Sequence, residues 1–335
     1  MTRKNLSPPL SELVQNFFCQ RLQAQQQASG HTVASYRDTL RLLLAFVEQE
    51  SGRAPSRQTL QDWDAPRILR FLDQVEQKRH CQPRTRNTRL AALRAFMRYA
   101  AQQAPEALAT SSRVLALPMK RFDRRLVRPL SAPEVEAILQ ATDPGTASGC
   151  RDHLLFNLLY HTGARVSEAL ALERQDIQWG PPSTIQFQGK GRKQRALPLL
   201  KPIAAELRRY LAQGPNEPAA LIFHNRFGER LTRSGVEKRL RQTVAQAAQH
   251  CSSLKERSVS PHTFRHTTAM CLLQAGVDIM VIALLLGHES PTTTHHYVEL
   301  DLQMKERCLR KLKSPKTKAD RFKPSDGLLQ FLENL

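Results

Sequence analysis

The stretch SPHTFRHTTAMCLLQAGVDIMVIALLLGHESPTTTHHY, residues 260–297, contains the start and stop signals of three short helices. Ser260–Pro261 combines an N-cap residue with a first-turn proline, so a helix is expected to begin there. Gly276 ends this helix, Asp278 caps a second one, and Gly287 ends the second. The third helix follows the turn after Gly287.

Residues able to bind and attack a phosphate are concentrated in this stretch. His262 and Arg265 are three residues apart, so both project from the positive end of the first helix, where an anion is favoured. His288 falls in the turn after the second helix. Ser290–Pro291 starts the third helix, which carries Tyr297, nine residues after His288. The stretch therefore holds a phenol nucleophile and cationic groups for one phosphodiester.

The composition indicates a nucleic-acid partner. The 335 residues suffice for two domains, and 50 basic against 30 acidic side chains give a net charge of +20, spread along the chain. This charge suits a protein that encircles nucleic acid, and the alternative is a merely basic soluble protein. The six cysteines form no C-x-x-C pair, which disfavours a zinc ribbon or a disulfide framework. Without a signal sequence or a long apolar run, we expect no membrane and a cytoplasmic, nucleoid-associated location of bacterial type.

The first third of the chain predicts a small all-α domain. Apolar residues recur at helical spacing in Thr32–Val47 and Arg84–Ala100, and Leu10–Gln26 and Thr59–Glu76 also have helical patterns. The segment 84–100 holds five basic side chains and no acidic one: Arg84, Arg86, Arg89, Arg94 and Arg98. We predict phosphate contacts for them, and the alternative is a surface kept basic for solubility.

A basic linker is predicted next. Residues 111–129 read SSRVLALPMKRFDRRLVRP, with five basic residues and one acid between Lys120 and Arg128. We expect this segment to lie along the backbone of bound DNA, with Lys120 and Arg121 as candidate contacts.

The second domain opens with a capping box, SAPE at Ser131–Glu134. A helix over Cys150–His161 then ends at Gly163, so Arg165 stands at the start of a further helix with Glu168 three residues later. These two residues belong to a T-G-x-R-x-S-E pattern. Taken alone, they could equally be an i, i+3 ion pair of little consequence.

A lysine-tipped β-hairpin is predicted after this motif. Thr184–Gln188 alternates as a strand, Gly189–Gln194 has the composition of a turn, and Arg195–Leu199 can pair back. Turn and returning strand follow a GKGxKxR pattern, in which the three basic letters are Lys190, Lys193 and Arg195. Lysines at a hairpin tip are ordinarily just solvated, which is the alternative interpretation.

Two more helices and one extended segment complete this half. Helices are expected over Pro202–Ala212 and Thr232–Gln249, with a short strand or extended segment at Ala220–Asn225. The basic face of 232–249, which includes Arg239, is predicted to face the major groove.

Together, H-x-x-R, LLGH with a tyrosine nine residues on, and the two upstream motifs resemble the catalytic core of the tyrosine recombinase (phage integrase) family. SYRDTL at 35–40 and the arginine-rich helix are similar to its core-binding domain. The resemblance implies a mainly α protein with a small β-hairpin or sheet. Its parts would be an all-α core-binding domain over 1–110, the basic linker over 111–129, an α+β catalytic domain over 130–300, and a basic tail with an apolar end over 301–335.

The resemblance also implies the roles of the site residues. Tyr297 would attack the phosphorus and form a 3′-phosphotyrosine, His262 would accept the phenol proton, and Lys190 would protonate the leaving 5′ oxygen. The guanidinium groups of Arg165 and Arg265 would clamp two phosphate oxygens. His288 would donate a further hydrogen bond to the phosphate, and Glu168 would support the active site. Lys193 and Arg195 would be accessory phosphate contacts.

Such an enzyme would act on double-stranded DNA at paired recombination sites, through a Holliday junction, without metal, cofactor or ATP. The layout is most like a Xer-type or transposon-encoded recombinase of a mobile element, acting as a homotetramer alone or with a related recombinase. The apolar LLQFLENL, 328–335, would then dock on a neighbouring subunit. The alternatives are an inactive DNA-binding protein, a type IB topoisomerase, and a metal-dependent nuclease, which the lack of an Asp or Glu pair beside the histidines disfavours. The target sequence, and the choice among integration, excision, dimer resolution and inversion, stay open.

Overall fold

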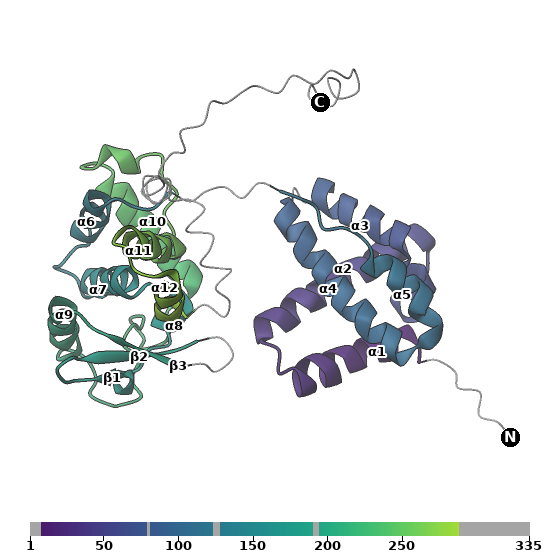
Figure 1. Ribbon diagram of the computed structural model, residues 1–335, viewed down its shortest axis with the longest axis horizontal. Coiled ribbons are helices and arrows are strands. Elements are labelled where there is room, and N and C mark those ends of the chain that lie inside the picture. The colour runs from purple at the N-terminus through teal and green to yellow at the C-terminus, as the bar shows by residue number, and fades with distance from the viewer. Residues whose placement is uncertain (1–7, 79–80, 123–127, 190–193, 288–335) are drawn as a thin grey trace, which may run out of the picture. The chain divides into compact units, whose positions relative to one another are not determined.

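The computed structural model describes residues 8–78, 81–122, 128–189 and 194–287. The chain divides into two compact units, Met1–Arg125 and Leu126–Leu335 (Figure 1). Each unit has its own hydrophobic core. Within the described ranges, no helix is long and apolar enough to cross a membrane.

The described part of the N-terminal unit is entirely helical, which confirms the prediction of an all-α domain. Its α-helices are α1 (Leu10–Asn16), α2 (Gly30–Ser51), α3 (Ala65–Lys78), α4 (Pro83–Gln103) and α5 (Leu108–Leu115). Local signals set the ends of the helices. In α2, for example, the Ser29 hydroxyl accepts a hydrogen bond from the Thr32 amide, and Gly52 ends the helix with a φ of 69°.

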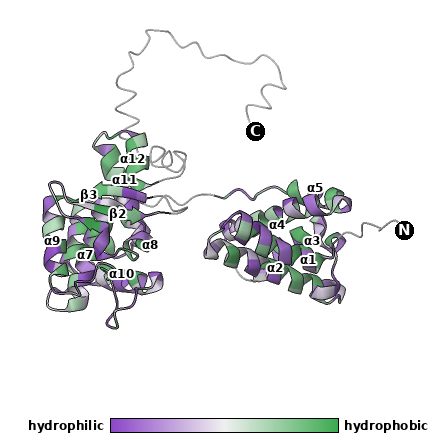
Figure 2. Cartoon of the chain, turned by 90° about the horizontal axis from the view of Figure 1, so that it is seen from below, coloured by the Kyte–Doolittle hydropathy of each residue, from purple (hydrophilic) through white to green (hydrophobic). Residues whose placement is uncertain are grey.

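Aromatic side chains form the centre of the N-terminal core. Phe17, Trp63 and Phe96 are buried, and the Phe96 ring centroid lies 5.4 Å from that of Phe17 and 5.3 Å from that of Trp63. Helix α4, which carries Phe96, contacts α1, α2, α3 and α5. Figure 2 shows apolar and polar residues along each of these helices, as expected for amphipathic helices around one core.

Two predicted helices are interrupted. The segment predicted as one helix from Leu10 continues α1 as a π-helix, Phe17–Gln25. The segment predicted from Thr59 consists of a 3-10 turn, Leu60–Trp63, followed by α3. Pro66 explains the second break, because a proline has no amide hydrogen to donate and therefore fits only the first turn of a helix.

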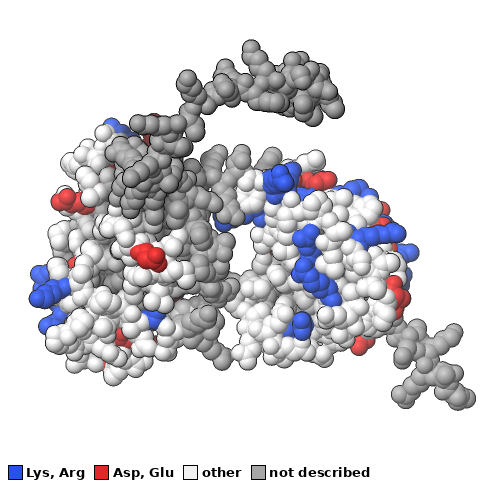
Figure 3. Space-filling model, in the orientation of Figure 1, with Lys and Arg blue, Asp and Glu red and all other residues white. Residues whose placement is uncertain are grey.

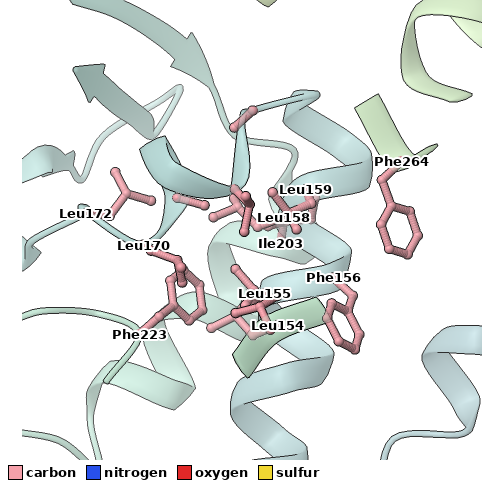
Figure 4. Close-up of a cluster of buried hydrophobic side chains, with 14 of the residues drawn as sticks. Leu154, Leu155, Phe156, Leu158, Leu159, Leu170, Leu172, Ile203, Phe223 and Phe264 are labelled. Atoms are coloured by element: carbon pink, nitrogen blue, oxygen red, sulfur yellow. The ribbon is translucent and has the colours of Figure 1, made fainter. Parts of the chain in front are cut away.

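In the second unit, helices and a small sheet surround a central helix, α7 (Ala147–Thr162). The α-helices are α6 (Ala132–Gln140), α7 (Ala147–Thr162), α8 (Val166–Ala169), α9 (Lys201–Leu211), α10 (Arg233–Ala247), α11 (Pro261–Gln274) and α12 (Ile279–Leu286). The strands are β1 (Ile177–Gln178), β2 (Thr184–Gln188) and β3 (Gln194–Pro198). Helix α7 is apolar on several sides because it packs against α6, α8, α9 and α11. Figure 4 shows its leucines and Phe156 among side chains from neighbouring elements.

The sheet is antiparallel in the order β1-β2-β3, which confirms the predicted hairpin. Phe187 pairs with Arg195 and Ile185 with Leu197. Strand β2 has the predicted bounds, whereas β3 begins and ends one residue earlier than the predicted Arg195–Leu199. Strand β1 was not predicted, because two residues are too short for a periodic signal. The segment 220–225 forms only isolated bridges, at Leu221 and His224, rather than a strand.

Candidate active site

Two helix ends meet at the candidate site and are held together by Arg265. Helix α7 ends at Gly163, with a φ of 59°, and α12 ends at Gly287, with a φ of 65°. The last carbonyls of a helix lack partners within it and favour a cation. Arg265 donates from Nη1 to the Gly163 carbonyl at 2.7 Å and from Nη2 to the Leu286 carbonyl at 2.7 Å. Its side chain is buried, so this cation joins α7 to α12 from inside the protein.

Helix α11 begins where the sequence predicted. The Ser260 amide donates to the Thr263 hydroxyl at 3.0 Å, and Pro261 occupies the first turn. His262 is exposed in that turn, and Arg265 lies one turn further along.

Arg165 reaches the same helix end from another direction. It occupies the N-cap of α8, directly after the end of α7. Its Nη2 donates to the Gly287 carbonyl at 3.2 Å, and its Nη1 donates to Glu168 Oε1 at 2.6 Å. Arg165 and Arg265, 100 residues apart in sequence, therefore bind adjacent carbonyls at the end of α12.

Glu168 is a buried carboxylate that pairs with two arginines. Besides Arg165, it accepts a hydrogen bond on Oε2 from Arg195 Nη2 at 2.8 Å, and its side chain is 4% exposed. Burial raises the pKa of Glu168, but the hydrogen bonds from Arg195 and from the Arg165 amide outweigh it and leave the pKa below its ordinary value. Glu168 is therefore ionised at neutral pH and fixes both guanidinium groups. The pair is therefore not the i, i+3 pair of little consequence that the alternative interpretation gave.

Arg195 connects the hairpin to the end of α12. Its guanidinium carbon lies 5.0 Å from the centre of the Phe187 ring, on the neighbouring strand. A Cβ atom at Gly287 would come within 2.8 Å of Arg195 Nη1, so the close approach depends on the absence of a side chain there. The predicted accessory phosphate contact is thus directed inward, toward Glu168.

The structure brings together Arg165, Glu168, Arg195 and Arg265 from three separate segments of the sequence. Four of the predicted site residues lie outside the described residues: Lys190, Lys193, His288 and Tyr297. His288 directly follows Gly287 in the sequence. No group of three or more His, Cys, Asp or Glu within the described ranges is arranged to hold a metal ion.

The predicted DNA contacts of α4 differ in exposure. Arg84 and Arg98 are exposed, Arg89 and Arg94 are half-buried, and Arg86 is buried. Figure 3 shows basic side chains gathered over α4 on the visible face of the N-terminal unit.

Some of the basic side chains predicted to contact DNA, in α4 and in the linker, also have partners inside the protein. Arg86 Nε lies 3.9 Å from the Glu76 carboxylate, and Lys120 Nζ lies 2.9 Å from it. Arg94 donates to the Leu117 carbonyl.

Among the remaining candidates, Arg121 is exposed, whereas Arg239 in α10 is half-buried and pairs with Asp152 of α7.

The ion pair between Arg257 and Glu134 was not predicted either. Arg257 pairs with the buried Glu134 and also donates to the carbonyls of Arg128 and Pro129, where the basic linker ends. Burial raises the pKa of Glu134, but the hydrogen bonds from the Ser131 amide, the Ser253 hydroxyl and Arg257 lower it to about 2. The capping box marked Glu134, but no local signal marks its partner Arg257, 123 residues away.

Comparisons with known proteins point to one family. The phage integrase family profile matches residues 128–304, and the phage integrase N-terminal SAM-like domain matches residues 16–104. The putative integrase/recombinase y4rC of Sinorhizobium fredii is 45% identical over 326 residues, 97% of this chain and 98% of that protein. The tyrosine recombinase XerC of Chlamydia muridarum is 31% identical over 309 residues, 86% of this chain and 94% of that protein. The fold is similar to that of a lambda integrase tetramer bound to a Holliday junction, with a TM-score of 0.61 and 18% identity over 88% of this chain and 78% of that chain.

Proposed function

Because the chain belongs to the phage integrase family of tyrosine recombinases, enzymes that break and rejoin DNA strands, we propose that it is a site-specific recombinase using a 3′-phosphotyrosine intermediate. Its substrate is double-stranded DNA at paired recombination sites. Strand exchange proceeds through a Holliday junction and requires neither metal nor ATP.

In the cleavage step, the phenol oxygen of Tyr297 forms a bond to phosphorus while the bond from phosphorus to the 5′ oxygen breaks. His262 takes the phenol proton, and Lys190 gives a proton to the departing 5′ oxygen. The phosphodiester is exchanged for a phosphotyrosine ester of similar energy. A 5′-hydroxyl from the other DNA site can therefore reverse the step and seal a recombinant strand.

Arg165 and Arg265 stabilise the charge that develops on the two non-bridging oxygens, and His288 adds a further hydrogen bond. Planar guanidinium groups suit this role because each can donate two parallel hydrogen bonds. They act best when held in place before the reaction, since fixed donors need no reorganisation in the transition state.

The observation that carries this proposal is the pairing of Arg165 and Arg265 on adjacent carbonyls at the end of α12. Arg165 binds the Gly287 carbonyl and Arg265 the Leu286 carbonyl, and His288 is the next residue of the chain. Two arginines from distant segments thus converge where the LLGH motif ends, with Glu168 fixing one of them.

The wider assembly is also part of the proposal. Residues 1–110 grip the DNA and 130–300 cut it, with 111–129 as the linker and 301–335 as the tail. Four subunits act together on two DNA sites, as the lambda integrase tetramer on a Holliday junction supports by its similar fold. A cytoplasmic enzyme that moves a mobile element fits the similarity to y4rC, and chromosome dimer resolution would use the same residues.

A nicked duplex tests the proposal without knowledge of the target. A random-sequence duplex library with nicks is incubated with the protein in EDTA, and covalently attached DNA is recovered after denaturation with SDS. We expect the wild-type protein to enrich one sequence as a covalent adduct, and the Tyr297→Phe variant to enrich none. A wild-type protein that binds DNA but forms no adduct in any sequence would contradict the proposal.

A further inference from the structure

Residues 224–230, HNRFGER, form a short hairpin-like projection, which we call the finger. The two residues before it, Ile222 and Phe223, are buried in the core of the second unit. His224 and Arg230 then pair as an isolated antiparallel bridge, so the chain leaves the core and returns within seven residues. Helix α10 begins three residues later, at Arg233.

The finger is held rigid by its own hydrogen bonds. The Asn225 side-chain oxygen accepts from the amides of Phe227, at 2.9 Å, and Glu229, at 3.0 Å. The Asn225 amide donates to the Glu229 carbonyl at 2.8 Å, and the Gly228 amide donates to the Asn225 carbonyl at 3.0 Å. Gly228 has a φ of 79°, which a residue with a side chain rarely adopts. The tip is therefore a built turn with a fixed direction.

This rigid turn displays an aromatic ring to solvent. Phe227 is 70% exposed, and the Arg226 guanidinium carbon lies 4.6 Å from the ring centre. One face of the ring is thus next to a cation. Because the ring is exposed on a hydrogen-bonded tip, it is accessible for contact with a partner.

The base of the finger is tied to the elements that form the candidate active site. Arg230 Nη2 donates to the Ser167 carbonyl at 2.8 Å, and Ser167 lies between Arg165 and Glu168 in α8. On the other side, Arg151 of α7 donates to the His224 carbonyl at 2.9 Å. The finger therefore has a fixed position relative to α8.

We propose that the finger is a DNA-contacting element, in which Arg226 binds a backbone phosphate and Phe227 packs against base pairs or sugars beside the cleavage position. This inference rests on the proposed recombinase function. If so, the finger contributes to DNA sequence specificity, because the free energy of inserting an apolar side chain at a base step depends on how easily that step deforms.

Charge favours DNA over a protein surface as the partner. Between residues 226 and 241 there are six basic and two acidic side chains. Three of these basic residues are exposed on α10: Arg233, Lys238 and Arg241. A ring flanked by cations suits a polyanion whose bases offer apolar faces.

Non-covalent binding to a mixed-sequence duplex tests the finger independently of cleavage. We expect Phe227→Ala to weaken binding roughly tenfold, as loss of an aromatic contact to a base does, without changing the salt dependence. Arg226→Gln should reduce the slope of log K against log salt by about 0.9, because one phosphate contact is lost. When the bound DNA is sequenced, Phe227→Ala should show a weaker base preference than the wild type at one or two adjacent positions of the site.

Trp179 provides the matched control. It is 42% exposed, and the Arg208 guanidinium carbon lies 4.7 Å from its ring, so it forms the same kind of exposed pair. It follows β1, the edge strand on the far side of β2 from β3, and Trp179→Ala should leave affinity and salt slope unchanged. Phe227→Leu, which retains an apolar side chain, should bind DNA better than Phe227→Ala and serves if the alanine variant fails to fold.

Two outcomes would overturn the inference. In one, the variants at 226 and 227 match Trp179→Ala in affinity, salt slope and base preference. In the other, they weaken only the association between protein subunits, which would make the finger a subunit contact. A protein whose finger variants lose DNA affinity as expected, but which never forms a covalent adduct, would instead refute the proposed recombinase while supporting the finger.

Discussion

Glu168→Gln should slow DNA cleavage by much more than its effect on stability explains. Glu168 pairs with Arg165 at 2.6 Å and with Arg195 at 2.8 Å. The substitution keeps the shape of the side chain but removes the charge that fixes both guanidinium groups. Arg165 would then be free to leave the orientation in which we propose that it binds the phosphate.

The size of the effect follows from burial. The Glu168 side chain is 4% exposed and that of Arg195 is 12% exposed. Removing one partner of a buried ion pair costs about 3–5 kcal/mol, and we expect about 3 kcal/mol because glutamine retains one acceptor oxygen. For catalysis, a misplacement of Arg165 by about 1 Å should lower the cleavage rate about 100-fold.

Glu134→Gln is the matched control, because Glu134 is also a buried carboxylate paired with an arginine. Its fall in pKa from 4.5 to about 2 corresponds to about 3 kcal/mol of stability at neutral pH. Its partner Arg257 binds the linker end rather than Arg165.

The assay combines urea unfolding with single-turnover cleavage of a nicked duplex, in conditions where all variants are folded. We expect both substitutions to lower the free energy of unfolding by similar amounts, but only Glu168→Gln to slow cleavage by about two orders of magnitude. Equal cleavage rates for the two variants would show that Glu168 does not act by fixing Arg165.

Two further predictions concern the end of α12 and acid stability. Gly287→Ala should lower both stability and cleavage rate, because its Cβ would lie 2.8 Å from Arg195 Nη1. Gly276→Ala is the control, because Gly276 has a φ of 85° and no atom lies within 4 Å of its Cβ. This control should cost only about 1 kcal/mol of backbone strain. Unfolding and cleavage measured on both variants check this, and equal cleavage rates would count against it. Because the pKa of Glu134 is lower in the folded protein, its contribution is present above pH 4.5 and is lost as pH falls toward 2. Unfolding measured across this range should show that loss in the wild type and a smaller one in Glu134→Gln, and parallel curves would contradict the assignment.

Most helix ends of the second unit could be predicted because their signals are local. Asp278 accepts a hydrogen bond from the Met280 amide, and Gly163 and Gly287 adopt the positive φ that favours glycine. Arg165 was placed correctly at the start of α8 for the same reason, since the preceding glycine ends α7.

The directions of the side chains could not be predicted, because tertiary contacts decide them. Arg265 was expected to project from the positive end of α11 but is buried against carbonyls of α7 and α12. Arg195 was expected at a phosphate, but its partner Glu168 lies 27 residues earlier in the sequence. The finger was missed because Asn225 and Gly228 signal only a turn, and the exposure of Phe227 depends on what packs around it.

The most direct measurement is to identify the residue that becomes joined to DNA. The covalent adduct from a nicked duplex is digested with protease and nuclease, and the modified peptide is sequenced by mass spectrometry. We expect a nucleotide attached through its 3′ phosphate to Tyr297, in the wild-type protein with EDTA present. Attachment at any other residue, attachment through a 5′ phosphate, or an adduct that persists in Tyr297→Phe would contradict it.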